Sequence, residues 1–157
     1  MHNMSLIPVI DPFENFIEQM GLITQSDGGP RIAGRIFGLL LVEGRPFALH
    51  EMADRLKISR ASASTNARLL AERGMLRLVA HGGDRQDYYA ISAQPYHQML
   101  ETVRGKMVKS AQRIAEAEAQ FTETDDAARQ RVRNLAEFYR QSADFMTHWA
   151  QQLKLAP

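Results

Sequence analysis

Residues 59–74 read Ser-Arg-Ala-Ser-Ala-Ser-Thr-Asn-Ala-Arg-Leu-Leu-Ala-Glu-Arg-Gly, and this stretch decides the fold. Ser59 is a good N-cap, and Gly74 suits the left-handed residue that ends a helix. Between them, apolar positions recur at the spacing of one helix face. They are Ala63, Ala67 and Leu70. We therefore expect a helix over residues 60–73 whose small inner face lets a second helix approach closely.

The segments on either side of this helix complete a recognisable motif. Before it, residues 47–49 are predicted to be short and extended, and a short amphipathic helix follows, with Met52, Ala53 and Leu56 facing inward. A turn at residues 57–58 separates this helix from the next one. After it, residues 75–80 and 88–92 are β-prone runs joined by a polar, glycine-bearing tip over residues 81–87. Helix, turn, helix and hairpin is the order of a winged helix-turn-helix. In that fold the second helix fits the DNA major groove and the hairpin can reach the neighbouring minor groove.

The outward face of the second helix carries short polar side chains and one arginine. The helical period places Ser64, Thr65 and Arg68 outward and Ser62 on the flank. Short donors and acceptors together with a forked cation are the groups that recognise base edges. We therefore predict base reading by Ser62, Ser64, Thr65 and Arg68, the alternative being that these serines are merely solvated.

Three arginines at helix starts suit contacts with DNA phosphates. Arg60 follows the N-cap, where the helix dipole also favours an anion. Arg31 and Arg35 lie at the start of an earlier helix and could face the DNA backbone in the same way. The alternative for these two is an ion pair with Asp27 or Glu43.

Charge is distributed unevenly, with the positive excess in the middle third. Residues 31–94 carry ten basic and six acidic side chains, whereas residues 1–30 carry four acids and no base. A positive segment rich in arginine is what a phosphate-facing surface needs. In the hairpin tip, Arg85 is predicted to enter the minor groove, and Asp84 beside it is predicted to orient that arginine.

The N-terminal segment, residues 1–30, is predicted to hold one helix that joins a dimer interface. Asp11 reads as its N-cap, Pro12 as its first residue and Glu14 as the partner that closes a capping box. The glycines and proline of residues 26–30 end it. Residues 31–93 then form the winged helix-turn-helix domain.

Residues 94–157 are predicted to form two long dimerisation helices. Their apolar positions alternate by three and four residues, so each helix carries a long apolar face. Two faces of this length exceed what the small winged helix-turn-helix domain can bury. A second copy of the chain would bury the surplus; the alternative is a helical hairpin within one chain. The predicted dimerisation residues are Leu100, Val103, Met107, Ile114, Leu135, Tyr139, Met146 and Trp149.

Composition excludes several classes of protein. The 157 residues are 45% hydrophobic and 24% charged, which is ordinary for a globular domain, and they include no cysteine. The five histidines are dispersed, and no phosphate-cradling glycine loop is present. We therefore expect no enzyme activity, no metal and no cofactor. No membrane-spanning run is evident, so a cytoplasmic location is expected.

The sequence resembles the MarR-type winged helix-turn-helix regulators, and among them the GbsR-like branch. The resemblance rests on Gly34-Arg35-Ile36-Phe37-Gly38-Leu39-Leu40, on the spacing Ser64-x-Asn66-x-Arg68-x-Leu70, and on the wing Gly83-Asp84-Arg85-Gln86-Asp87-Tyr88-Tyr89. It is dense over residues 31–92 and adds Asn66 to the candidate phosphate or minor-groove contacts. The chain departs from the family in carrying alanine at positions 63 and 67, where larger aliphatic residues are common.

What the resemblance implies is a homodimeric, sequence-specific regulator of transcription, often a repressor, with a mainly α fold and a small β-hairpin wing. Such a dimer is expected to bind a pseudo-palindromic operator in double-stranded DNA. Independently of the resemblance, a small-molecule effector is expected in the cleft between the winged head and the dimerisation helices, the alternative being that the residues lining it are simply core. These residues are Phe13, Phe16, Met20, Met99, Val103 and Met107. The alternative function is a protein-interaction module that uses a degenerate winged helix as the scaffold of a helical dimer.

Overall fold

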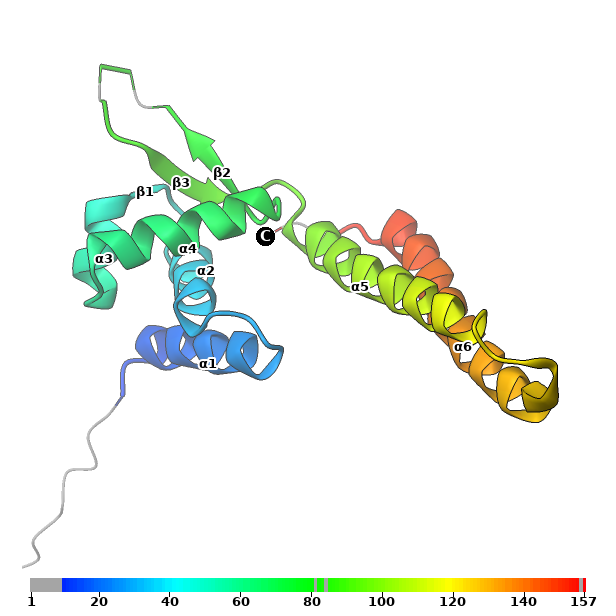
Figure 1. Ribbon diagram of the computed structural model, residues 1–157. Coiled ribbons are helices and arrows are strands. Elements are labelled where there is room, and N and C mark those ends of the chain that lie inside the picture. The colour runs from blue at the N-terminus through cyan, green and yellow to red at the C-terminus, as the bar shows by residue number, and fades with distance from the viewer. Residues whose placement is uncertain (1–9, 81, 84, 156) are drawn as a thin grey trace, which may run out of the picture. The chain divides into compact units, whose positions relative to one another are not determined.

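The computed structural model describes residues 10–80, 82–83, 85–155 and 157 (Figure 1). The chain divides into two compact units, of which one extends to Ala93 and the other begins at Gln94. The fold is mainly helical with a small antiparallel sheet, which confirms the predicted class. No helix within the described ranges is long and apolar enough to cross a lipid bilayer.

The described residues of the first unit form four helices around one core. They are α1 (Pro12–Ser26), α2 (Arg31–Glu43), α3 (Leu49–Leu56) and α4 (Arg60–Glu72). Helix α2 lies at the centre and contacts α1, α3 and α4. Its apolar side chains meet those of its neighbours in a core whose largest fully buried aliphatic members are Ile17, Ile36, Leu39, Leu40, Met52 and Leu56.

The ends of α1 and α4 follow from their capping residues. The side chain of Ser59 accepts a hydrogen bond from the backbone N–H of Ser62 at 3.0 Å, and Gly74 has φ +71°, as predicted. Asp11 is the N-cap of α1, as predicted, and accepts from the N–H of Phe13 at 2.8 Å. The predicted capping box is wrong in its second half, because the carboxylate of Glu14 instead pairs with Arg55 of α3.

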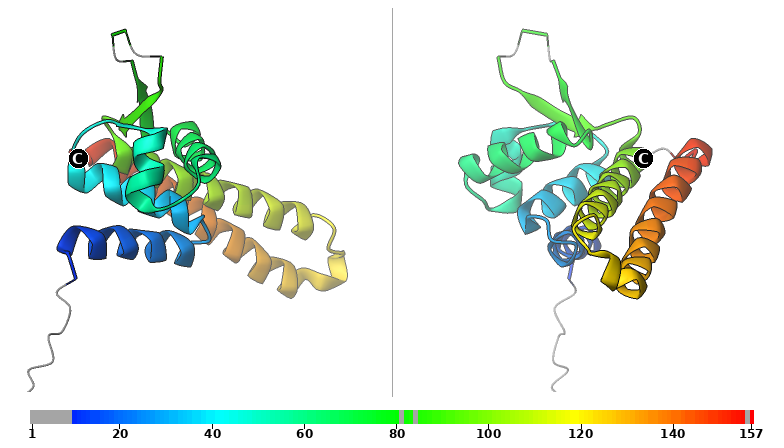
Figure 2. Two further views of the ribbon diagram at one scale, coloured as in Figure 1. Left: turned by 90° about the vertical axis from the view of Figure 1, so that its left-hand side faces the viewer. Right: turned by 45° about the vertical axis from the view of Figure 1, so that its right-hand side comes forward.

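A three-stranded antiparallel sheet completes this unit. Its strands are β1 (Phe47–Ala48), β2 (Leu76–Val79) and β3 (Tyr88–Ile91), in the order β1-β3-β2. The predicted hairpin is β2 and β3, which extend away from the helices of this unit (Figure 2). The predicted extended segment at Phe47 adds a third strand, in register with Tyr89, and so ties the base of the hairpin to the start of α3.

Glycines bring α1 and α2 unusually close together. A methyl group at Gly34 would overlap the backbone carbonyl of Met20 and the side chain of Thr24. At Gly38, one turn further along α2, an added Cβ would lie 3.1 Å from the Cβ of Met20. The two backbones are therefore separated by glycine rather than by side chains.

One carboxylate of α1 binds two arginines of α2. Glu18 lies 2.9 Å from the guanidinium of Arg31 and 2.7 Å from that of Arg35. Arg35 also donates a hydrogen bond of 3.0 Å to the backbone carbonyl of Leu56, at the end of α3. Neither Asp27 nor Glu43 is the partner, so the predicted alternative was right about ion pairing and wrong about the acid.

The Glu18 pair predicts a dependence of stability on pH. Burial opposes its ionisation, but the hydrogen bond from Arg31 and the charge of Arg35 hold the pKa of Glu18 below its usual range. The ionised carboxylate therefore stabilises the fold above the unfolded-state pKa, and this stabilisation is lost as the pH falls through the folded-state value. Because Glu18 is partly exposed, we expect Glu18→Gln to cost about 0.5–1 kcal/mol at neutral pH. Urea unfolding from about pH 7 to about pH 3 should show that difference shrinking toward zero; a constant difference would contradict it.

The second unit is a hairpin of two long helices, α5 (Pro95–Glu118) and α6 (Asp126–Gln152), with a short 3-10 turn, η1 (Glu123–Asp125), between them. The helices lie side by side and antiparallel (Figures 1 and 2). Near the turn, Glu118 binds both Arg129 and Arg133 at 3.0 Å. The intramolecular hairpin, which was the alternative to a purely intermolecular arrangement, is therefore present.

Small residues form the inner face of α6, and large ones remain outside. Ala136, Ala143 and Ala150, spaced by seven residues, are its buried positions. Of the predicted dimerisation residues on this helix, Tyr139 and Met146 lie half-buried beside the alanines, whereas Leu135 and Trp149 are exposed. Two phenylalanines lie on the same outer side. Together they form what we call the outer stripe: Leu135, Phe138, Phe145 and Trp149, which are 49%, 62%, 68% and 47% exposed.

Candidate nucleic-acid interface

Helix α4 presents two chemically different faces. Ala63, Ala67 and Leu70 are buried, as predicted. On the other side, Thr65 and Arg68 are exposed, and Ser62 and Ser64 are half-buried. The predicted base-reading side chains therefore lie on the solvent side of one helix, at the edge that also faces the base of the wing.

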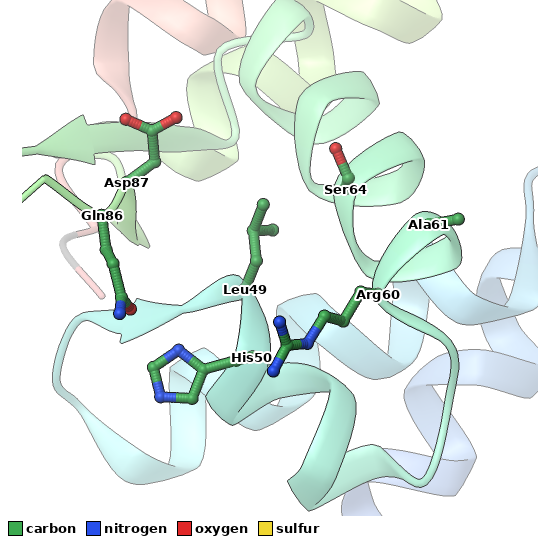
Figure 3. Close-up of a pocket in the computed structure, with 7 residues that line it drawn as sticks. All are labelled: Leu49, His50, Arg60, Ala61, Ser64, Gln86 and Asp87. Atoms are coloured by element: carbon green, nitrogen blue, oxygen red, sulfur yellow. The ribbon is translucent and has the colours of Figure 1, made fainter.

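A groove of about 600 Å³ separates α3 and α4 from the base of the wing (Figure 3). It combines the first residues of two helices with the segment just before β3. Its lining residues are Leu49, His50, Arg60, Ala61, Ser64, Gln86 and Asp87. Figure 3 shows the guanidinium of Arg60 and the imidazole of His50 turned into the space between α3, α4 and the wing. The groove thus joins the outer face of α4 to the wing as one continuous surface.

The groove suits an anion along most of its length. Leu49 and Arg60 are the first residues of α3 and α4, so both helices bring the positive end of their dipole to it. The Arg60 side chain adds a full positive charge, and His50 and Gln86 add hydrogen-bonding nitrogens. Among the described residues that line the groove, Asp87 is the single carboxylate.

Arg68 lies close to this groove and is held from within its own helix. It donates a hydrogen bond of 3.1 Å to the side-chain oxygen of Ser64, one turn earlier. Burial and the negative charge of Asp87 raise the pKa of Tyr89, and the positive charge of Arg68 acts in the opposite direction. The charges of Arg68 and Asp87 therefore both act on the Tyr89 hydroxyl, in opposite directions.

Three predicted phosphate contacts are placed differently from expectation. Asn66 is only 8% exposed, and its Nδ2 donates to the carbonyl oxygen of Ser62 at 2.9 Å, so it supports the helix instead of facing a phosphate. Arg35 is largely enclosed between Glu18 and the end of α3. Arg31 shares Glu18 but keeps half of its side chain exposed.

In the wing, Arg85 is exposed, as a minor-groove contact requires. Asp84, predicted to orient it, lies outside the described residues. His50 and Gln86 were not predicted at all. His50 is isolated in the sequence, and only the fold brings it to Arg60; its position at the start of the first helix of the motif, which crosses the DNA backbone in such folds, was the available signal.

Comparisons with known proteins agree with this geometry. Residues 27–87 match the model of the MarR family. The HTH-type transcriptional regulator MmpR5 of Mycobacterium tuberculosis is 39% identical over 77 residues, which are 48% of this chain and 47% of that protein. The chain thus spans about half the length of the curated relative that it matches. A solved structure described as the crystal structure of a transcriptional regulator has a TM-score of 0.68 and 25% identity, covering 90% of this chain and 99% of the other.

The fold and the groove define a winged helix-turn-helix protein. Within it, residues 27–87, which hold α2 to α4 and the base of the wing, are similar to the MarR family. Both similar proteins are named as transcriptional regulators.

Proposed function

We propose that the protein is a DNA-binding regulator of transcription that places α4 in the major groove. The observation that carries this proposal is the groove between α3, α4 and the wing, which aligns two helix N-termini with Arg60 and His50 beside the exposed face of α4. A DNA backbone strand fits such a surface, because phosphates are held by helix N-termini and by cationic side chains. Ser62, Thr65 and Arg68 would then face base edges, and Arg85 would follow the minor groove.

We further propose a homodimer in which the outer stripe of α6 packs against a second copy. Large apolar side chains that remain exposed after the hairpin has formed are typical of an interface between chains. The predicted α5 positions Leu100, Val103, Met107 and Ile114 are half-buried or exposed in the hairpin and could extend this contact. A two-fold dimer would bind a pseudo-palindrome with half-sites about one helical turn apart.

Three finer features belong to the same proposal. Membership of the GbsR-like branch is supported by the motif residues of the head and the wing. A repressor role and control by a small molecule are supported by the resemblance to regulators that behave in this way. Thermal-shift screening followed by calorimetry with and without DNA would test control by a small molecule, since a true effector must have different affinities in the two conditions.

Two arginine variants test DNA binding and separate its two components. Arg68→Ala should cost about 1–3 kcal/mol on the preferred sequence and relax preference at one base position. Arg60→Ala should weaken all sequences alike and lower the slope of log K against log salt by about one for each phosphate that is no longer neutralised. Fluorescence anisotropy over a range of salt concentrations measures both effects. The matched control is Arg113→Ala, an exposed arginine of α5.

The same titrations address the alternative function. A protein-interaction module built on this scaffold would show no salt-dependent affinity for duplex DNA. Wild-type protein without such affinity would overturn the proposed function. Arg68→Ala protein with unchanged affinity and unchanged preference would instead show that α4 is oriented differently from our proposal.

A further inference from the structure

We propose that Ser64 and Asp87 are positioning residues that fix the orientation of Arg68, one from the recognition helix and one from the wing. This inference rests on the proposed function, because it assigns to Arg68 the reading of a base. It changes the role of Ser64, which the sequence predicted to contact bases itself. It also gives a role to Asp87, an acid on a surface proposed to face DNA.

The contact within α4 is direct. Ser64 and Arg68 are one turn apart, so their side chains lie on the same face, and the Ser64 oxygen accepts from a terminal nitrogen of Arg68 at 3.1 Å. A free arginine has several rotatable bonds, and ordering them opposes binding. The hydrogen bond restrains the guanidinium before DNA arrives and leaves its other N–H groups available for a base edge.

Asp87 lies in the wing and lines the same groove as Ser64. Figure 3 shows the two on opposite sides of the groove with Leu49 between them. Tyr89, two residues further along the chain, is buried in the sheet and senses the charges of both Asp87 and Arg68. In this proposal the Asp87 carboxylate attracts the Arg68 guanidinium toward the wing, and the hydrogen bond to Ser64 holds that guanidinium on the helix.

The Asp87 carboxylate should weaken DNA binding, and a positioning role would explain why an acid is present there. A carboxylate in a groove that accepts a DNA backbone repels phosphates and weakens binding to every sequence. If Asp87 restrains Arg68, it also prevents the guanidinium from turning to a nearby phosphate, which would add affinity without discrimination. Asp87 would thus lower affinity in general and raise specificity at one base position.

The experiment measures base preference one position at a time. The wild-type protein is used to select a preferred site from a randomised duplex library, and each single-base variant of that site competes against it for binding. Ser64→Ala and Asp87→Asn should each reduce preference about three- to tenfold at the position where Arg68→Ala acts, and little elsewhere. Asp87→Asn should in addition raise affinity for unrelated duplex DNA. Ser64→Thr, which keeps the hydroxyl, should restore the preference.

Double variants and a matched control distinguish positioning from other effects. In the Arg68→Ala background, Ser64→Ala and Asp87→Asn should cause no further loss at that base position, since the group they position is gone. Thr65→Ala removes a neighbouring hydroxyl of the same helix, and its effect should be independent of Arg68→Ala. Thermal unfolding of each variant confirms that these partly exposed positions leave the fold intact.

Several results would overturn the inference. Unchanged preference in Ser64→Ala would exclude Ser64 as a positioning residue, and loss at a different base would return it to direct reading. A uniform gain of affinity in Asp87→Asn, with all preferences intact, would show that Asp87 only repels phosphate. If no preferred site can be selected at all, the proposed function itself fails, and this outcome is distinct from the other three.

Discussion

Gly34→Ala should destabilise the protein by about 1–3 kcal/mol, whereas Gly105→Ala should stabilise it by about 0.5–1 kcal/mol. Both glycines are inside helices, but their surroundings are opposite. At Gly34 the added methyl group would overlap the backbone of α1 at Met20, and a backbone carbonyl cannot rotate away as a flexible side chain can. At Gly105 of α5 an added Cβ would meet nothing within 4 Å, so the gain in helix propensity is unopposed.

Chemical denaturation followed by circular dichroism measures both changes in the free energy of unfolding. Because the substitution is the same at both positions, each variant is the control for the other. Equal effects at the two sites would show that α1 and α2 are not in close contact at Gly34. A destabilising Gly105→Ala would instead indicate that another chain approaches α5 at that glycine.

Phe145→Glu and Trp149→Glu should each weaken the proposed dimer by a factor of about one hundred or more. Both side chains belong to the outer stripe and are exposed on the hairpin, so a charge there should reduce the stability of the monomer very little. Against the apolar stripe of a second copy, however, an unpaired carboxylate must lose its hydration, which costs several kcal/mol. Sedimentation velocity at micromolar concentration should detect monomer, and affinity for a two-half-site DNA should fall in parallel because the two heads are no longer linked.

Gln130→Glu is the matched control for these variants. It introduces the same charge on an exposed, polar position of the same helix. We expect it to leave both the sedimentation coefficient and the affinity for DNA unchanged. Dimeric Phe145→Glu and Trp149→Glu proteins would exclude the outer stripe as the interface.

The parts of the fold that local sequence determines were predictable. The N-cap at Ser59, the left-handed Gly74 and the spacing of the inward alanines define α4 within 16 residues, and the structure reproduces all three. The hairpin followed from two β-prone runs and a polar tip. Strand β1 was not predicted to pair, because two residues carry too little pattern to reveal a partner 40 positions away.

The site was less predictable because it depends on contacts between elements. Arg35 and Arg60 look alike in the sequence, since each lies near the start of a helix. Only the packing of α1 shows that Glu18 already neutralises the first of them. Asn66 lies in the middle of a polar stretch, yet the fold turns it inward against the carbonyl of Ser62.

In the helical hairpin, too, the sequence does not reveal which elements contact each other. A continuous apolar pattern on α6 indicates that the helix has partners, but it does not show how that surface is divided among them. The structure assigns the alanines at intervals of seven to α5, since small side chains permit the closest approach. The aromatic residues of the outer stripe do not pack against α5 and stay exposed. The spacing of the apolar residues alone does not show which of them pack against α5 and which stay exposed.

Arg35 also determines how the protein can be cut into fragments. Its guanidinium connects Glu18 of the first helix to the carbonyl of Leu56, just before the turn that leads into α4. A fragment beginning at Arg31 would contain every residue of the DNA-binding motif, yet it would leave this cation without its counter-charge and uncover the glycine face of α2. The smallest autonomous reading head therefore begins at the N-cap Asp11, and a shorter one would be unstable for reasons unrelated to DNA.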